Sequence, residues 1–440
     1  MTAALDISSP PGQDLESRER GARMHLSRLK RLTRAGCAVA MAVAVAACGG
    51  GSSTSSSSGN ATIPAGLSVK SFDSSFSVMS QFKGLTSAGK GLVGVILPDT
   101  TSSTRWVDFD APYITKALQA AGYSASQFKV DNAQGNDATE LALAQADITQ
   151  GATVLVVTPL DSTVGSQIQS YAQSHGVKMI SYDRATFTGN NTYYDSFDNV
   201  QVGKLIGQGF MDCVTAWNVS NPQVFVLSGG EDTDPNAVSF AQGYNQVIWG
   251  NDTTPQKAGT TNSKGFTLVG EQIAPGWVNA AGGTIFQQQF TAHPNINATV
   301  EANDGLGNAV IQVLKNSGVA AKKIPATGQD ATSQGMINVL QGYQCGSVYK
   351  PIYLEAQAAV ALATILRAGQ TPPSSLVNGT TSPPKGASGN QQPAVLLTPQ
   401  WVDTSNMAST VIKDRFVSAA AICSAVGASV CQQYNIPPNG

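Results

Sequence analysis

The chain has 440 residues, of which 42% are hydrophobic and only 12% are charged, and its formal net charge is −2. This length is sufficient for two domains that each have their own core. The charged share is about half of the usual one, and the near-neutral balance gives no basis for a nucleic acid or an anionic membrane surface as partner, so we expect neither. Because charges are few, those that follow predicted strands carry more information than in an average chain.

The N-terminal part of the chain has the features of an export signal. Basic side chains precede an apolar run over residues 38–47, which is too short to cross a bilayer and ends in small residues. Cys48 follows directly, as the lipid-modified Cys does in a lipobox. We therefore expect residues 1–47 to be a lipoprotein-type signal peptide, with Met24 a better start than Met1, and Cys48 to be lipidated. The protein would then be exported, and either anchored by this lipid to the outer face of the cytoplasmic membrane or periplasmic.

A Gly- and Ser-rich segment follows the signal. Residues 48–66 have the composition of a flexible tether between the lipid and a folded domain. The next stretch, residues 65–90, shows no clear pattern beyond a short helix around 74–82.

Four cysteines remain in the exported chain after Cys48. Their even number in an oxidising compartment indicates disulfides among Cys213, Cys345, Cys423 and Cys431. Three pairings are possible, and the short separation of the last two favours a bridge between them, which leaves the first two as partners. The exported chain has only two histidines, His175 and His293, and no Cys/His cluster. We expect no metal site and no cofactor.

From residue 91 onward, apolar runs alternate with segments of helical spacing. Strands are predicted over residues 91–97, 128–131, 154–157 and 176–182, and helices over 105–121, 137–149 and 163–175. Continuous apolar runs are typical of parallel strands that are buried on both faces. Their alternation with helices of about ten to fifteen residues indicates βαβ units.

After residue 199 the alternation begins again. Further strands are predicted over residues 224–227, 266–269, 298–301, 324–326, 348–349 and 395–397, and helices over 200–214, 235–248 and 351–367 and from residues 277, 305 and 331. A loop rich in Pro, Gly, Ser and Asn covers 371–392. No Ser- or Pro-rich linker separates the two halves. We therefore predict an α/β protein with two Rossmann-like lobes, each with a parallel sheet, joined by several chain crossings.

Polar side chains follow the predicted strands in both halves of the chain. They are Asp99, Arg105, Trp106, Asp161, Asp183 and Arg184 in the first half, and Glu231, Asp232, Asp234, Asn236, Asn303, Asp304, Gln329 and Asp330 in the second. Any one of the acids or amides is commonly a helix cap, and Asp183 with Arg184 could be a cap and its neutralising partner. Ligands of open α/β sheets bind beyond the carboxyl ends of the strands. The presence of so many polar groups at one edge favours a shared ligand site.

This mixture of side chains suits a monosaccharide. Sugar hydroxyls both donate and accept, so Asp and Asn can accept from them while Arg and Asn donate to their lone pairs. The apolar C–H faces of the ring suit an indole, and Trp106 and Trp277 lie near the predicted strand ends. A phosphate would favour a Gly-rich loop at a helix start, but the acids after Ser228-Gly229-Gly230 would repel an anion.

Enzyme functions have weaker support. The chain has no Gly-x-Ser-x-Gly turn and no His near a plausible nucleophile. A carboxylate pair such as Asp304 and Asp330 could cleave glycosides, but hydroxyl binding by both is the simpler interpretation. We predict that the protein is not an enzyme.

With these residues identified, the chain resembles the periplasmic sugar-binding proteins of ABC transporters, and among them the xylose-binding protein and its relative that binds several aldoses. The similarity runs from about residue 91 to 416. It rests on Arg105-Trp106, Ser181-Tyr-Asp-Arg184, Tyr194-Asp-Ser-Phe-Asp-Asn199, Gly276-Trp277, Asn303-Asp-Gly305, Gly328-Gln-Asp-Ala331, Val348-Tyr-Lys-Pro351 and Leu396-Leu-Thr-Pro399. The resemblance implies a type I periplasmic binding protein, whose two lobes close on a sugar and are joined by a hinge of three crossings.

The resemblance also implies roles for individual residues. The sugar would be bound by Arg105, Asp183 and Arg184 from one lobe, by Asn236, Asn303, Asp304 and Asp330 from the other, by the aromatic walls Trp106 and Trp277, and by Lys350 near the hinge. The N-terminal lobe would comprise residues 91–198 and 351–392, and the C-terminal lobe 199–350 and 393–417. Residues 418–440 form a Cys-containing tail beyond the family pattern. The loop 231–235 and the segment 250–265 are longer than usual, which leaves the choice of pentose or hexose open.

The resulting hypothesis is a substrate-binding lipoprotein that captures a monosaccharide, xylose or a related aldose, and delivers it to an ABC permease in the cytoplasmic membrane. We expect a monomer. Two alternatives remain: a sugar sensor for a membrane signalling receptor, and an exported enzyme that processes glycosides.

Overall fold

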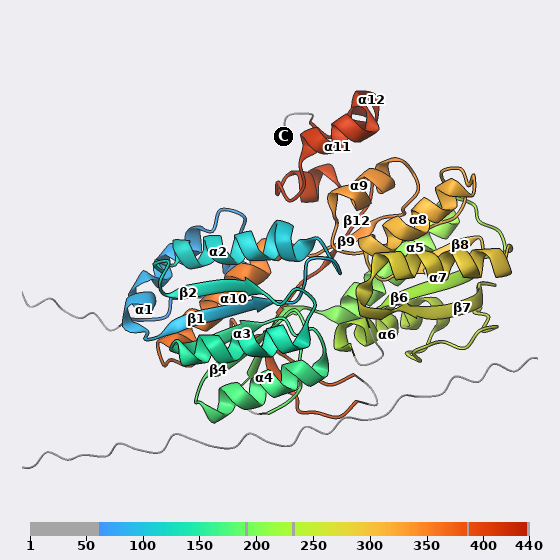
Figure 1. Ribbon diagram of the computed structural model, residues 1–440. Coiled ribbons are helices and arrows are strands. Elements are labelled where there is room, and N and C mark those ends of the chain that lie inside the picture. Colours follow the sequence, from blue (N-terminus) through green and yellow to red (C-terminus); the bar gives the residue numbers. More distant parts are fainter. Residues whose placement is uncertain (1–60, 190–191, 231–233, 385–386, 438–440) are drawn as a thin grey trace, which may run out of the picture. The chain divides into compact units, whose positions relative to one another are not determined.

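The computed structural model describes residues 61–437, apart from 190–191, 231–233 and 385–386, and these residues form two α/β lobes (Figure 1). Both lobes belong to the same compact unit of the chain. The predicted signal peptide, Cys48 and the first part of the predicted tether lie outside the described residues. Within the described ranges, no helix is long and apolar enough to cross a membrane.

The N-terminal lobe contains a seven-stranded sheet in the order β10-β11-β5-β4-β3-β1-β2. All neighbouring strands are parallel except the edge pair β10–β11. The strands are β1 (Leu92–Leu97), β2 (Phe128–Asn132), β3 (Ala152–Val157), β4 (Lys178–Tyr182), β5 (Thr192–Phe197), β10 (Gly379–Thr381) and β11 (Gln392–Leu397).

Helices cover both faces of this sheet, which explains the continuous apolar strands. Successive side chains of a strand point to opposite faces, so Val93 and Val95 of β1 enter a different core from Ile96. The first core contains side chains of α2 and α10, and the second contains side chains of α3 and α4. These helices are α2 (Ala111–Ala120), α3 (Asp137–Thr149), α4 (Ser162–Ser174) and α10 (Ile352–Arg367).

The C-terminal lobe contains a three-stranded parallel sheet, β7-β6-β8, and an antiparallel pair, β12–β9. Its strands are β6 (Gln223–Gly229), β7 (Thr267–Ala274), β8 (Ala298–Glu301), β9 (Ser347–Tyr349) and β12 (Gln400–Val402), and its helices are α5 (Asn199–Ala216), α6 (Pro235–Trp249), α7 (Asn279–Ala292), α8 (Asp304–Asn316) and α9 (Ser333–Leu340). The predicted strand at 324–326 is wrong. The carbonyl of Pro325 accepts from Thr299 N at 2.8 Å, but a proline has no N–H with which to continue the ladder.

The chain passes between the two lobes at residue 198, at 350–351 and at 398–399. The predicted lobe boundary at 392/393 is wrong, because β11 pairs in parallel with β5 in the N-terminal sheet, with Val395 opposite Asp195. The chain therefore re-enters the C-terminal lobe only at β12.

The segment before β1 is packed against the N-terminal lobe. Phe72, Met79 and Phe82 are buried in the same core as α2 and α10. The predicted tether ends earlier than residue 66, because Ile63 packs against this core and Gln370 Nε2 donates to the Ala61 carbonyl at 2.6 Å. The predicted helix around 74–82 is a 3₁₀ helix, η2 (Ser77–Phe82), followed by α1 (Lys83–Ala88).

Two disulfides join the four cysteines that follow the tether. Cys213 of α5 is bonded to Cys345, and Cys423 is bonded to Cys431. This is the pairing that the sequence spacing favours. The second bridge links α11 (Ala419–Val426) to α12 (Ala428–Gln433), so the C-terminal tail is a helical hairpin.

The Cys213–Cys345 bridge is expected to stabilise the C-terminal lobe, because it closes a loop of 132 residues. Replacing both cysteines by Ala should cost about 2–5 kcal/mol of unfolding free energy. Urea unfolding of the variant and the wild type would measure this. The matched Cys423→Ala/Cys431→Ala variant removes a bridge that spans a separation of only 8 residues, so it should lose less unfolding free energy. An equal or larger loss would contradict the prediction.

Candidate ligand-binding cleft

A cavity lies between the two lobes. It is lined by polar and aromatic residues from the strand ends of both: Ser102, Ser103, Arg105, Trp106, Asp183, Arg184, Asn236, Phe240, Trp277, Asn303, Gln329, Asp330 and Lys350. A concave site with a few convergent polar groups and aromatic side chains is typical of small-molecule binding.

The loop after β1 brings Ser102 and Ser103 to the cavity. Asp99 shapes this loop, because its Oδ1 accepts from the backbone N of Thr101 at 2.7 Å and of Ser102 at 2.6 Å. Its Oδ2 accepts from Ser102 Oγ at 2.6 Å. Arg105 follows directly and opens a π-helical turn, Trp106–Asp110.

Arg105 is a buried guanidinium held by three carboxylates. Its Nε and Nη2 donate to the two oxygens of Asp110 at 2.9 and 2.7 Å. Nη2 also donates to Glu355 at 2.8 Å, and Nη1 donates to Asp183 at 2.6 Å. These bonds use four of the five N–H groups of a guanidinium. The fifth, on Nη1, has no partner in the described part of the chain and belongs to a side chain that lines the cavity.

Asp183 connects the lobes at the centre of the cleft. Besides Arg105, its side chain accepts from Asn236 Nδ2 of the C-terminal lobe at 3.1 Å, and Lys350 Nζ lies 3.7 Å from it. Its backbone carbonyl accepts from Asn236 Nδ2 at 2.9 Å and from Tyr194 Oη at 2.7 Å. Burial alone would raise the pKa of Asp183, but Arg105, Lys350 and Arg184 outweigh burial and lower it. Asp183 is therefore a carboxylate.

Lys350 neutralises one acid from each lobe. Its Nζ lies 3.2 Å from Asp330 Oδ1 and 3.7 Å from Asp183 Oδ2, and the residue is only 3% exposed. Ser103 Oγ of the N-terminal lobe donates to Asp330 Oδ2 at 3.2 Å. The cavity thus has charges of both signs in contact, which suits a neutral ligand with hydroxyl groups better than an ion.

Two indoles form the apolar walls, and two guanidinium groups lie near one of them. Trp106 Nε1 donates to Ser102 Oγ at 3.1 Å, and the Arg105 and Arg184 guanidinium carbons lie 4.4 and 5.5 Å from its ring centroid. Trp277 Nε1 donates to Asp234 Oδ2 at 2.8 Å. The Trp277 ring can lie against β6 only because residue 229 is Gly, since a Cβ there would come within 2.0 Å of the ring.

Three cavity residues have a backbone conformation that non-glycine residues seldom adopt. The φ angles of Asp183, Trp277 and Asp330 are +62°, +60° and +87°. Such residues cost about 1–3 kcal/mol each and cluster at ligand sites. The backbone conformation that places these two carboxylates and one indole at the cavity therefore lowers the stability of the fold.

Asp304 does not line the cavity, which corrects its predicted role. Its Oδ1 accepts from Gln344 Nε2 at 2.8 Å and from Ser347 Oγ at 2.7 Å, and its Oδ2 accepts from the backbone N and Oγ1 of Thr332 at 2.7 and 2.9 Å. All of its acceptor directions serve the interior of the C-terminal lobe. Burial raises its pKa to about 7. Its neighbour Asn303 does line the cavity and also caps α8, accepting from Leu306 N at 2.8 Å.

The other predicted residues do lie at the cavity: Arg105, Trp106, Asp183, Arg184, Asn236, Trp277, Asn303, Asp330 and Lys350. The sequence did not lead us to assign Ser102, Ser103, Phe240 or Gln329 to the ligand. Gln329 is one of the polar residues that follow the predicted strands, but only its neighbour Asp330 was assigned to the sugar. Phe240 lies one turn into α6, where an apolar residue gives no signal that separates a cavity wall from a core position.

A group of buried acids lies around Arg105 and its partners. Burial raises the pKa of Asp110, although Arg105 and Tyr182 Oη, which donates at 2.7 Å, oppose the shift. Burial likewise raises the pKa of Glu355 to about 8 despite Arg105. Burial also raises the pKa of Asp195 well above its usual value, with Glu355 and Asp183 adding to the shift.

The comparisons with known proteins fit this geometry. The sequence profile of the periplasmic binding protein domain family matches residues 93–371. The D-xylose-binding periplasmic protein of Escherichia coli (strain K12) is 33% identical over 290 residues, which is 65% of this chain and 80% of that protein. The multiple sugar-binding periplasmic receptor ChvE of Rhizobium radiobacter is 30% identical over 340 residues, 76% of this chain and 92% of that protein.

The chain belongs to the periplasmic binding protein domain family. Among solved structures, a carbohydrate transporter solute binding protein from Chloroflexus aurantiacus, in complex with D-glucose, has a TM-score of 0.63 at 23% identity and covers 75% of this chain and 98% of that one. The resemblance and the fold class predicted from the sequence, a type I periplasmic binding protein with two lobes and three crossings, are thereby confirmed. In this chain, the cavity described above lies between the two lobes.

Proposed function

We propose that this protein captures a monosaccharide in the cleft between its lobes and delivers it to an ABC permease. The observation that carries the proposal is the cavity itself. Donors, acceptors and two indoles from both lobes line it, and three of these residues hold unfavourable backbone angles there. The similarity to the two relatives that are named for sugar binding extends over 80% and 92% of their lengths.

Each wall of the cleft has a chemical role in the proposal. Arg105 and Arg184 donate to ring and hydroxyl oxygens, while Asp183 and Asp330 accept from hydroxyl groups. Arg184 has N–H groups left for further bonds, because its hydrogen bonds to the described residues are those of Nη1 to the Pro159 and Leu160 carbonyls at 3.2 and 3.5 Å. The indoles of Trp106 and Trp277 cover the apolar faces of the sugar ring. No covalent step is needed, so we propose binding without chemical conversion.

Ligand binding and lobe closure are one equilibrium in this account. Asp183 and Arg184 belong to one lobe, and Asn236, Asn303 and Asp330 to the other, so a sugar can contact both sets only when the lobes are together. A ligand that gains contacts only in the closed state shifts the population towards that state. A permease can then recognise the loaded protein by its closed form.

We further propose D-xylose or a related aldose as the ligand, lipid attachment through Cys48, and a monomeric state. Attachment by a lipid and tether would keep the protein close to its permease while the lobes move freely.

A thermal-shift experiment tests the proposed function. The protein, freed of any co-purifying ligand by unfolding and refolding, is heated with xylose, arabinose, ribose, glucose, galactose or inositol. A ligand at about 1,000 times its dissociation constant adds about 4 kcal/mol to the stability of the native state, so at least one aldose should raise the melting temperature by several degrees. Equal melting temperatures with all of these compounds would refute the proposal.

A further inference from the structure

The C-terminal segment contributes an aromatic side chain to the wall that separates the lobes. After β12 the chain forms a short π-helical turn, η5 (Ala408–Ile412), and continues to Phe416. Phe416 is only 4% exposed. We call residues 413–417 the C-terminal strap.

The Phe416 ring links the two lobes directly. It is stacked on Phe109 of the N-terminal lobe, with 4.1 Å between ring centroids and 14° between ring planes. On another side it meets Tyr349 of β9, at 4.9 Å and 60°. Phe109 is itself buried in the same hydrophobic cluster as the C-terminal lobe. The strap thus joins the lobes in addition to the three covalent crossings.

Phe109 belongs to the π-helical turn that carries part of the cleft. In the same turn, Trp106 forms a wall of the cavity and Asp110 holds the Arg105 guanidinium through two bonds. These three residues lie within one turn of backbone. A displacement of Phe109 therefore moves the residues that position Arg105 and Trp106.

The strap also braces the hinge crossing at 350–351. Asp414 Oδ2 accepts from Tyr349 Oη at 3.1 Å and from Tyr353 Oη at 2.9 Å. One tyrosine stands before the crossing and the other after it, and Lys350 of the cavity lies between them in the chain. The strap is therefore in contact with both the wall and the hinge of the cleft.

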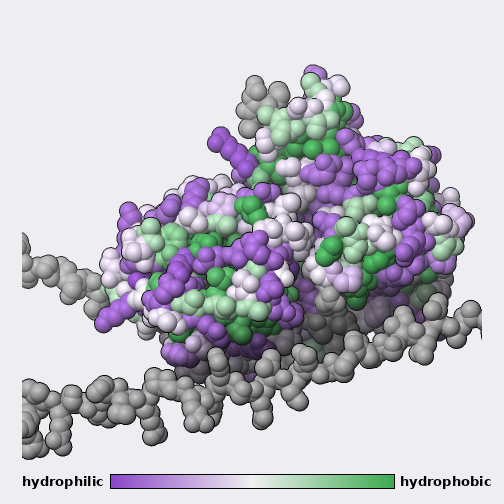
Figure 2. Space-filling model, viewed as in Figure 1, coloured by the Kyte–Doolittle hydropathy of each residue, from purple (hydrophilic) through white to green (hydrophobic). Residues whose placement is uncertain are grey.

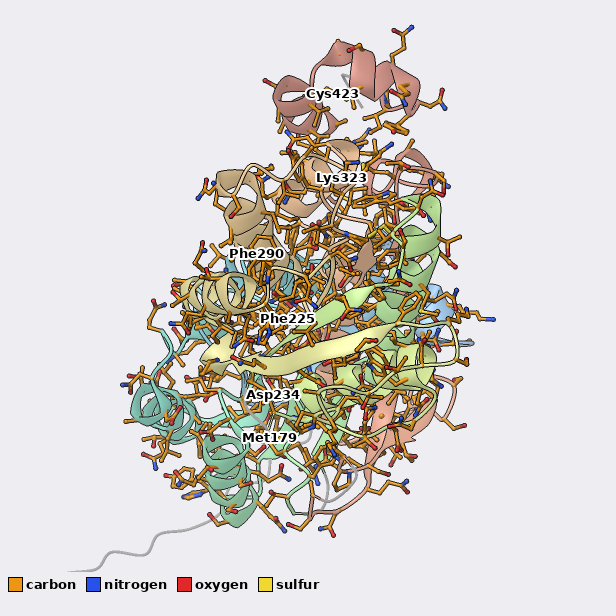
Figure 3. The ribbon with its side chains drawn as sticks, turned by 90° about the vertical axis from the view of Figure 1, so that its right-hand side faces the viewer. Met179, Phe225, Asp234, Phe290, Lys323 and Cys423 are labelled. Atoms are coloured by element: carbon orange, nitrogen blue, oxygen red, sulfur yellow. A yellow bond between two sulfur atoms is a disulfide. The ribbon has the colours of Figure 1, made fainter. Side chains whose placement is uncertain are left out.

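Contacts of the strap itself and of the chain beyond it fix the position of the strap. Arg415 has a φ of +56°, and Phe416 N donates to the Val411 carbonyl at 2.9 Å, which turns the segment back on itself. Ile422 and Cys423 of the disulfide-linked hairpin are buried in the same cluster as Phe416. Figure 1 shows this hairpin, labelled α11 and α12, beside α9, and Figure 3 shows Cys423 at the same end of the molecule. No charged residue occurs between Phe416 and Pro437, and the surface there is mostly pale or green in Figure 2.

We propose that Phe416 is a positioning residue for the sugar cleft: by stacking on Phe109 it holds the turn that carries Arg105 and Trp106 in its binding geometry. The hairpin of residues 418–437 serves to anchor the strap. This inference rests on the proposed function for its effect on affinity, but its effect on the Trp106–Asp110 turn does not depend on any ligand.

Hydrogen exchange followed by mass spectrometry tests the effect on the turn. In Phe416→Ala, the amides of residues 105–113 should exchange faster than in the wild type. The control is Phe290→Ala, which removes a partly buried ring of α7 that stacks on Phe286 at 5.4 Å. This control should lose stability but leave exchange at 105–113 unchanged. Unchanged exchange at 105–113 in Phe416→Ala would overturn the proposal.

A double-mutant cycle tests the effect on affinity. Phe416→Ala and Phe109→Ala should each weaken binding of the aldose identified above by about three- to tenfold, and the double variant should bind no more weakly than the worse single variant. Phe290→Ala should bind within about twofold of the wild type. Additive losses would overturn the coupling. If no aldose binds the wild type, the proposed function fails, and the exchange experiment still decides the role of Phe416.

Discussion

Replacing Arg105 by Met is expected to prevent stable folding at neutral pH. The guanidinium donates to Asp110, Asp183 and Glu355, and all four side chains are buried. Methionine fills a similar volume but leaves these acids without their cation. Removing one partner of a buried ion pair typically costs about 3–5 kcal/mol, which is a large part of the stability of a typical protein. Asp183 keeps Lys350 at 3.7 Å, so the loss falls mainly on Asp110 and Glu355.

The pH dependence of this variant should identify the cause. Burial already raises the pKa of Glu355 to about 8 and raises that of Asp110, and in both cases Arg105 opposes the shift. Without Arg105 these pKa values rise further. A carboxyl whose pKa is higher in the folded than in the unfolded state stabilises the fold at low pH, and this stability is lost as pH rises towards the folded value. Arg105→Met should therefore be most stable near pH 5 and lose stability as the pH rises to 8 and beyond.

Circular dichroism melts at pH 5, 7 and 9 would measure this dependence. The double variant Arg105→Met/Glu355→Gln serves as the control, because it removes one of the acids that lost their partner. It should melt at a higher temperature than Arg105→Met at pH 7 and depend less on pH. A single variant that melts like the wild type at pH 9 would show that Arg105 does not balance these charges.

Replacing Asp330 by Ala is expected to abolish most of the sugar affinity while leaving the protein folded. Asp330 is the acid of the C-terminal lobe that faces Lys350 and Ser103 across the cleft. Its loss removes an acceptor for sugar hydroxyls and, among the described residues, leaves Lys350 with Asp183 as its one acidic partner, at 3.7 Å. Charged hydrogen bonds contribute about 1.5–3 kcal/mol, so binding should weaken by roughly 10- to 100-fold or more. Asp330 has a φ of +87°, and Ala tolerates such a backbone angle less well than Asp does, so the variant should also lose some stability.

Equilibrium titration of Asp330→Ala and of the control Asp212→Ala would check this expectation. Asp212 is an exposed acid of α5 in the same lobe, and its Oδ1 accepts from Gln208 Nε2 at 2.8 Å. The control carries the same change in net charge and should bind like the wild type. Equal affinities of both variants would place the sugar elsewhere.

The fold was predictable where burial on both faces leaves a continuous apolar run. The strands at 91–97 and 154–157 satisfy this condition, and both lie within the seven-stranded sheet. β5 was not predicted as a strand because Tyr193, Asp195 and Ser196 interrupt its apolar pattern. Its buried Asp195 belongs to the group of buried acids around Arg105 and its partners, so this strand does not have the composition of an apolar core.

The site was predictable as a set of strand ends but not in its internal bonding. A polar residue after a strand indicates the correct edge of the sheet, and this holds for Asp183, Asn303 and Asp330. It cannot show which way the side chain points, so Asp304 was assigned to the ligand although it binds Thr332, Gln344 and Ser347 instead.

Long-range partners leave no local signal at all. Arg105 and Glu355 are 250 positions apart in the chain, and nothing in either segment indicates the other. The assignment of β11 to the N-terminal sheet fails for the same reason, since an apolar strand fits either lobe equally well by composition.

Isothermal titration calorimetry of the ligand-free protein with the aldose that gives the largest thermal shift tests the central claim most directly. The account predicts a single site with 1:1 stoichiometry and measurable heat for the wild type, with binding lost or greatly weakened in both Asp330→Ala and Arg184→Ala. No heat with any aldose, or full affinity in both variants, would contradict a sugar site between the lobes.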